Sequence, residues 1–326
     1  MNAKENLLRV IRHDHPQWVP YGMENTIVIC PPIVTRPQRA GSDSWNVRWE
    51  WDAGGTYPSN EEHVITDLSA WRDQIHFPDL NACVGSQFPS GWGGEEAPVV
   101  LKDVDRDTHL LCGVIELSLF ERSYLLLGME EALMSYVTQT RLMDELLGAI
   151  ADFHIELIKR FDDAADLDMI WYGDDWGTQQ GLFLPPEIWR RTVGKHTRRV
   201  YNCMKQRDLI INQHSCGKIE SVFADIVEMG ADVWNPCQPC NDLASLKRRF
   251  AGRVTFCGGI DSQFVLDRPG VTTDEVRAEV RRRIDDLAEG GGYIAAPSHS
   301  VTYQAGVMEA MNDEIRTYGQ KFYRKW

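Results

Sequence analysis

From about residue 109 onward, short apolar runs alternate with longer segments in which apolar residues recur at helical spacing. The apolar runs are bounded by Gly, Pro, Asp or Asn and predict strands. We expect strands at HLLCGVIEL (from His109), DMIWYG (from Asp168), DLIINQH (from Asp208), DVWNP (from Asp232), RVTFCGG (from Arg253) and GYIAAP (from Gly292). The intervening amphipathic segments predict helices near 140–161, 185–205, 217–229, 242–250, 273–289 and 304–322.

This alternation predicts parallel strands joined by helical crossovers, within one domain that spans residues 1–326. An earlier strand, WVPYGM (Trp18 to Met23), follows a short N-terminal helix, and an eighth strand is expected between residues 60 and 105. We therefore predict an α/β protein with a (β/α)8 TIM barrel. No G-x-G-x-x-G follows a strand and no P-loop is present, which disfavours an open nucleotide-binding sheet.

Residues 41–97 break the rhythm and are rich in Gly, Ser and Trp. We expect an irregular, aromatic-rich insertion that covers one mouth of the barrel. Aromatic loops there would suit a flat, apolar substrate, although each tryptophan singly is more often a packing residue. Five tryptophans lie in predicted loops: Trp45, Trp49, Trp51, Trp92 and Trp176.

Nearly every unusual polar motif follows directly after a predicted strand. In an α/β barrel the carboxyl ends of the strands form one rim, and active sites lie at that rim. Motifs from distant stretches are therefore expected to converge on one cavity. They are Gly22-Met23-Glu24-Asn25, Gly173-Asp174-Asp175-Trp176-Gly177, His214-Ser215-Cys216-Gly217, Asn235-Pro236-Cys237-Gln238-Pro239-Cys240, Gly258-Gly259-Ile260-Asp261-Ser262-Gln263 and Ser298-His299-Ser300.

His214 and Cys216 are the strongest metal-binding candidates. They lie two residues apart at the end of a predicted strand, so their side chains point the same way. Zinc accepts imidazole and thiolate ligands together. For an isolated pair, the alternative is a core histidine beside an inert thiol. Further candidate ligands after neighbouring strands favour the metal site: Cys237, Cys240, Cys257 and His299.

Two acidic groups are candidates for catalysis. Asp174 and Asp175 follow the apolar strand MIWY, and adjacent carboxylates in an apolar enclosure are expected to differ in pKa, so that one can act as an acid. A helix cap is the alternative for this pair. Glu24 also follows an apolar strand, as an acid or base, a ligand or a solvated turn. We expect the substrate to contact Asn25, Tyr172, Trp176, Asp261 and Gln263.

The composition excludes several classes of protein. The 34 basic and 48 acidic residues give a net charge of −14, which argues against a general nucleic-acid surface. No apolar run approaches the roughly 18 residues that cross a membrane, and no signal-peptide pattern is visible at the N-terminus. In this context the eight cysteines are not expected to form disulfides. We therefore expect a cytoplasmic protein.

Four segments resemble the uroporphyrinogen decarboxylase superfamily: GDDWGTQQGLFLPPEIWR, HSCGKIE, FCGGIDSQ and GGYIAAPSH. They look most similar to its methyltransferase branch, which includes corrinoid O-demethylases and methylcobamide:coenzyme M methyltransferases. The H-x-C-G motif is the specific part, because it is typical of the methyltransferases rather than the decarboxylases. The Arg-rich N-terminal motif of the decarboxylases is missing, since the strand here runs into Tyr21-Gly22-Met23-Glu24-Asn25.

The resemblance implies that His214 and Cys216 hold Zn2+ together with a third ligand after the last strand. Relatives often carry a cysteine at that place, and this chain has His299. His299 is the expected third ligand, with Cys257 on the neighbouring strand as the alternative. The corrinoid-binding signature D-x-H-x-x-G is absent, so the corrinoid (cobalamin) should arrive on a separate corrinoid-binding protein.

These expectations combine into a corrinoid-dependent methyltransferase of the O-demethylase type. It would transfer a methyl group from a small donor, a methoxylated aromatic, to cob(I)alamin, with zinc polarising the ether oxygen and Asp174 or Asp175 supplying a proton. The alternatives are a methylcobamide:thiol methyltransferase, a decarboxylase and a non-catalytic ligand-binding barrel. The sequence is also compatible with a homodimer.

Overall fold

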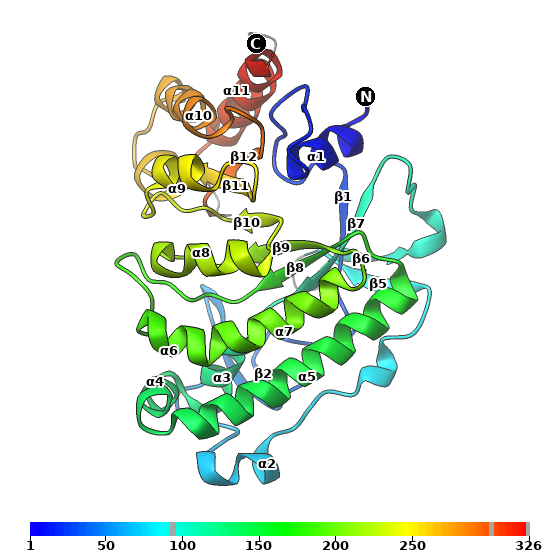
Figure 1. The fold of residues 1–326 in the computed structure, drawn as a ribbon, viewed down its shortest axis with the longest axis vertical. Coiled ribbons are helices and arrows are strands. Elements are labelled where there is room, and N and C mark those ends of the chain that lie inside the picture. The colour runs from blue at the N-terminus through cyan, green and yellow to red at the C-terminus, as the bar shows by residue number, and fades with distance from the viewer. Residues whose placement is uncertain (92–95, 300–302, 324–326) are drawn as a thin grey trace.

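The computed structural model describes residues 1–91, 96–299 and 303–323 of the chain (Figure 1). Trp92 and Ser300, which belong to the predicted aromatic and strand-end motifs, lie outside the described residues. Among the described residues, no helix is both long enough and apolar enough to cross a membrane.

A parallel sheet forms the centre of the molecule, as the alternating pattern predicts. Six strands follow one another in the predicted places, and β1 joins them at one side. They are β1 (Thr26–Ile29), β7 (Leu110–Ile115), β8 (Met169–Gly173), β9 (Ile210–His214), β10 (Val233–Asn235), β11 (Thr255–Ile260) and β12 (Tyr293–Pro297). The α/β class and the parallel pairing are thereby confirmed.

The first and last strands of this parallel series approach each other. Tyr21 makes a parallel bridge with Ala295 of β12, and backbone hydrogen bonds of 2.8 and 3.0 Å flank the bridge. Only five peptide units separate Tyr21 from Thr26 in β1, which limits their separation to about 19 Å. In a flat sheet β1 and β12 would lie about 29 Å apart. The sheet therefore curls toward closure, as expected for a barrel.

The early strand is parallel but its regular pairing begins later than predicted, and the segment expected to hold the eighth strand contains antiparallel strands instead. Regular pairing begins at Thr26, because Pro20 lacks an N–H group and the Glu24 side chain accepts the N–H of Tyr21 (2.7 Å). Between residues 60 and 105 the chain forms β5 (Gln87–Ser90) and β6 (Glu96–Val100). These strands are antiparallel and extend the sheet beyond β1.

Helices cover the sheet, and Figure 1 shows α5, α7, α8, α9 and α10 following one another along its side. The expected helix at 185–205 is divided at Thr192, where the backbone leaves the helical region. The α-helices are α1 (Ala3–Ile11), α2 (Trp71–Gln74), α3 (Leu119–Leu127), α4 (Met129–Thr138), α5 (Thr140–Ala165), α6 (Pro186–Arg191), α7 (Val193–Lys205), α8 (Glu220–Met229), α9 (Leu243–Phe250), α10 (Thr273–Leu287) and α11 (Val307–Phe322). Shorter turns are η1 (Leu68–Ala70), η2 (Leu80–Ala82), η4 (Leu101–Asp103) and η5 (Ser262–Leu266).

The segment expected to be irregular contains a small sheet. It is built from β2 (Gly41–Ser42), β3 (Arg48–Asp52) and β4 (Gly55–Pro58), all antiparallel. Trp45 and Trp49 are buried and join the main hydrophobic core, whereas the Trp51 side chain is exposed. This part of the insertion therefore packs against the body of the protein.

Two hydrophobic clusters show which end of the sheet is covered and which end forms an open rim. One lies between the strands and the surrounding helices. The other is formed by inward-facing strand residues together with Leu7, Val10 and Ile11 of α1. Because α1 packs on residues near the strand starts, such as Leu110 and Met169, it closes the amino-terminal end. The carboxyl ends of the strands form the opposite rim.

Candidate metal centre

Three potential metal ligands meet at the carboxyl ends of β8 and β9. Within this part of the described chain, ligand atoms of Asp175, His214 and Cys216 all lie within 4.8 Å of one another. The Cys216 Sγ is 3.5 Å from His214 Nε2, and the same nitrogen is 3.4 Å from Asp175 Oδ1. The backbone N–H of Cys216 donates to Asp175 Oδ1 (2.7 Å), which holds the aspartate beside the pair.

The spacing of these atoms fits a tetrahedral zinc ion. Zinc binds histidine nitrogen at about 2.0–2.1 Å, thiolate sulfur at about 2.3 Å and carboxylate oxygen at about 2.0–2.2 Å. In tetrahedral geometry these bonds separate nitrogen from sulfur by about 3.6 Å and nitrogen from oxygen by about 3.4 Å. The observed separations are 3.5 and 3.4 Å. The donor set therefore fits zinc in both chemistry and geometry.

Neighbouring side chains orient the His214 ring. Its Nδ1 is 2.7 Å from Asn235 Oδ1, and Asn235 in turn donates to Asn212 Oδ1 (2.5 Å). Because an amide oxygen can only accept, Nδ1 carries the hydrogen and Nε2 presents its lone pair to Cys216 and Asp175. The Trp171 ring packs on His214 with centroids 4.5 Å apart and donates to the same Asn235 oxygen. Burial also lowers the pKa of His214, which favours the neutral ring that a metal requires.

Two glycines allow the loops that carry these ligands to approach each other. Gly217 has a φ of +83°, and a Cβ added to it would lie 2.2 Å from the backbone of Gly177. A side chain at position 217 would push apart the loops after β8 and β9. The glycine of the H-x-C-G motif therefore brings Asp175 to the histidine and cysteine.

The two candidate third ligands, His299 and Cys257, are not among the ligand atoms that meet there, although His299 is close enough to His214 to contribute to lowering the pKa of that ring. His299 Nε2 is 2.6 Å from Gln238 Nε2, and Gln238 Oε1 accepts the N–H of Gly217. Gln238 thus links His299 to the loop that carries Cys216, and its amide occupies the histidine nitrogen. Cys257 lies in the middle of β11 among apolar residues of the barrel interior, and burial raises the pKa of its thiol to about 12.

The two adjacent aspartates have different surroundings. Asp174 is fully buried below the first turn of α3, where it accepts the N–H groups of Phe120 (3.1 Å) and Glu121 (2.9 Å) and the indole N–H of Trp176 (2.7 Å). Burial nevertheless raises its pKa to about 7. The alternative interpretation as a helix cap describes Asp174, whereas Asp175 faces His214 and Cys216.

Glu121, which was not singled out in the sequence, belongs to the same acidic cluster. Its side chain is buried, and burial together with the charges of Asp175 and Asp174 raises its pKa well above the ordinary value. Tyr124 donates its hydroxyl hydrogen to Glu121 Oε1 (3.3 Å). The cluster of Glu121, Asp174 and Asp175 (the carboxyl cluster below) can therefore hold a proton at neutral pH.

Glu24 and Asn25 do not join the metal ligands. Glu24 accepts the backbone N–H of Tyr21 and lies 3.5 Å from the indole nitrogen of Trp18, so it stabilises a local turn. Asn25 donates to the carbonyl of Thr108, immediately before β7 begins. Both residues precede β1 and lie near the amino-terminal end of the sheet.

The remaining predicted substrate residues are dispersed. Tyr172 is buried under α5, where its hydroxyl is 3.0 Å from His154 Nδ1. Trp176 is buried against Trp189. Asp261 caps the turn at 262–266 through the N–H of Phe264, and Gln263 in that turn is exposed.

Three residues at the site carried little signal in the sequence. Asn235 lies in a strand-end motif, but its residue type alone does not indicate a metal ligand. Trp171 is of a residue type expected in any buried strand. Glu121 lies inside a helix, six residues after β7 ends, so its distance from the strand end concealed it. For Trp171, alternation along the strand places its side chain inward, on the same side as Met169 and Gly173.

Comparison with known proteins identifies a family. The family model for uroporphyrinogen decarboxylase (URO-D) matches residues 115–318. Among solved structures, a methyltransferase from Methanosarcina mazei is similar over 98% of this chain and 99% of its own, with a TM-score of 0.68 and 14% identity. An endo-β-1,4-xylanase from Gloeophyllum trabeum matches 64% of this chain and 74% of its own, with a TM-score of 0.40 and 10% identity. No curated protein sequence matched.

Proposed function

The chain belongs to the uroporphyrinogen decarboxylase (URO-D) family, and from this premise we propose that it is a zinc-dependent methyltransferase. The methyl acceptor would be cob(I)alamin on a separate corrinoid protein. The observation that carries the proposal is the cluster of Asp175, His214 and Cys216 at the rim of the sheet. Full-length similarity to a fold that also occurs in a Methanosarcina mazei methyltransferase supports it.

Asp175, His214 and Cys216 would hold the zinc ion, because their spacing matches its bond lengths. Bound there, zinc would supply a Lewis acid for the oxygen that carries the methyl group. Asn235 fixes the tautomer of His214, so the ligand nitrogen is preoriented.

The same rim offers groups for a methoxylated aromatic donor. Trp171 lies against His214 and presents an aromatic surface next to the ligands, where a substrate ring could stack. We propose that Glu121 or Asp174, whose pKa values are raised, supplies the proton for the leaving oxygen, since the neighbouring Asp175 would be held as a zinc ligand. Loss of such an electrostatic contributor typically costs on the order of 10² to 10³ in rate.

The third zinc ligand can be identified by substitution. The resemblance points to His299, whereas the distances favour Asp175, and we expect Asp175→Ala to lower zinc affinity more than His299→Ala. Zinc titration of both variants, with Cys257→Ala as the control for a buried thiol, measures this. Normal zinc binding by Asp175→Ala together with loss in His299→Ala would restore the assignment to His299.

Turnover with a defined partner tests the function. The purified chain should demethylate its methyl donor only when a corrinoid protein and a reductant are added, because the chain has no D-x-H-x-x-G signature of its own. Methoxyarenes, methanol, methylamines and methyl thioethers should be compared as donors by following cobalt methylation. Activity confined to methylamines or thioethers would refute the aryl-ether donor, and tight binding of free cobalamin by the isolated chain would refute the separate partner.

A thiol acceptor is the second outcome of this assay. The same ligands could activate a thiol, which would then accept the methyl group from methylcobalamin. Supplying methylcobalamin and a thiol in place of the donor distinguishes the two directions of transfer.

A further inference from the structure

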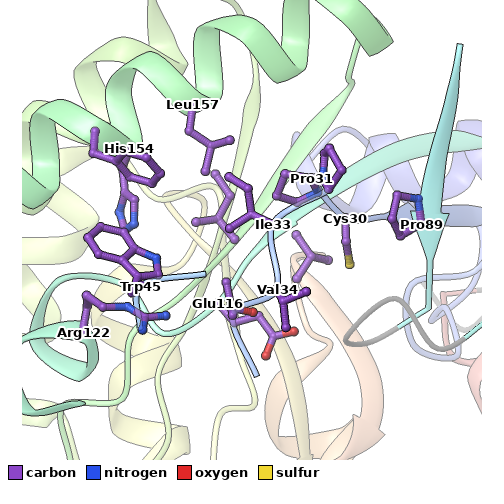
Figure 2. A pocket seen from close by; sticks show the side chains of 15 residues that line it. Cys30, Pro31, Ile33, Val34, Trp45, Pro89, Glu116, Arg122, His154 and Leu157 are labelled. Carbon is purple, nitrogen blue, oxygen red and sulfur yellow. The ribbon is translucent and has the colours of Figure 1, made fainter. Parts of the chain in front are cut away.

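A cavity of about 280 Å³ lies beside the carboxyl ends of β1 and β7, separate from the metal ligands. Figure 2 shows Arg122, Trp45 and His154 at one end of it and Cys30 and Pro89 at the other. This volume lies just below the range of about 300–1,000 Å³ that is common for ligand pockets, so the cavity suits only a small molecule.

A buried guanidinium group lines this cavity. The Arg122 side chain is 1% exposed, and its Nη1 donates to Asp43 Oδ2 at 2.8 Å. Asp43 is fully engaged, because its other oxygen accepts the backbone N–H groups of Trp45 and Val47. The Trp45 ring covers the guanidinium at 4.9 Å from its centroid, so one flat face of the group is occupied.

The other two guanidinium nitrogens lack partners. Within the described residues, neither Nε nor Nη2 of Arg122 has a hydrogen-bond acceptor, although both are buried. A buried donor without a partner is costly, and such groups are rare in folded proteins. Nε and Nη2 together form one edge of the guanidinium, and this edge matches the two oxygens of a carboxylate.

We propose that the cavity binds the carboxylate of a small organic acid, toward which the Arg122 guanidinium turns its unpartnered edge so that Nε and Nη2 act as a bidentate donor pair. Trp45 and the apolar side chains of Ile33 and Leu157 would contact the rest of the molecule. This binding does not depend on the proposed function, because none of Asp175, His214 and Cys216 lines the cavity.

Comparing a carboxylic acid with its neutral amide tests the proposed site by binding alone, without any turnover. Calorimetric titration should show that 4-methoxybenzoate binds roughly 10- to 100-fold more tightly than its neutral isostere 4-methoxybenzamide, as expected for charge-assisted hydrogen bonds. Arg122→Gln should abolish this preference. Arg141→Gln is the matched control, because Arg141 lies on α5 with its side chain 81% exposed and should keep the preference.

Three results would overturn the site: equal affinity for acid and amide, no binding of the acid at millimolar concentration, or a carboxylate preference that survives in Arg122→Gln. If Arg122→Gln does not fold, the wild-type ratio and the Arg122→Lys variant still decide, since lysine keeps the charge but not the two-nitrogen edge. Absence of methyl transfer with intact carboxylate binding would count against the proposed function alone.

Discussion

Purified protein should contain about one zinc ion per chain, and Cys216→Ser or His214→Ala should lose most of it together with methyl transfer. The expectation follows from the ligand spacing, because each substitution removes one of the atoms that lie 3.5 Å apart at the site. Metal analysis and the corrinoid-methylation assay measure both effects. Cys257→Ala is the matched control, since it removes a buried thiol from β11, two strands away from β9, and should retain zinc and activity.

Zinc affinity should also rise with pH. In the metal-free protein, burial and the charge of Asp175 raise the pKa of the Cys216 thiol, so the thiol must release a proton when the metal binds. Titration between pH 6 and 8 should show progressively tighter binding. Full zinc retention by both Cys216→Ser and His214→Ala would refute the zinc site.

Asp174→Ala should destabilise the fold by about 3 kcal/mol, because it leaves three buried N–H groups without their acceptor. Asp242 provides a matched control, since it caps α9 from an exposed position through the N–H of Ser245. Asp242→Ala should cost only about 1 kcal/mol. Equal losses in chemical denaturation would contradict the buried role of Asp174.

The stability difference between wild type and Asp174→Asn should depend on pH. The carboxyl group has a pKa of about 7 in the folded protein, above the value near 3.9 of an unfolded aspartate. Its contribution to stability is therefore present below about pH 4 and declines as pH rises toward 7. Unfolding at pH 5 should separate the two proteins more than unfolding at pH 8. A constant difference would show that the folded pKa is not raised.

Local patterns determined the strands and the metal pair. Six apolar runs bounded by turn residues identified β7 to β12, since a strand with apolar side chains on both faces has a distinctive composition. His214 and Cys216 are two residues apart at the end of a strand, and the two-residue period of extended chain accounts for their shared direction. These features depend on neighbours in the sequence and on helix and strand geometry.

The tertiary structure decided which polar groups surround that pair. Asp174 and Asp175 are adjacent in sequence, yet one is buried below α3 while the other meets His214, because the close contact of Gly177 with Gly217 sets the path of their loop. Arg122 pairs with Asp43, 79 residues away, through an insertion with no regular pattern. Long-range packing fixes the burial and partners of such groups, and burial determines whether a charge is paired, titrates or binds a ligand.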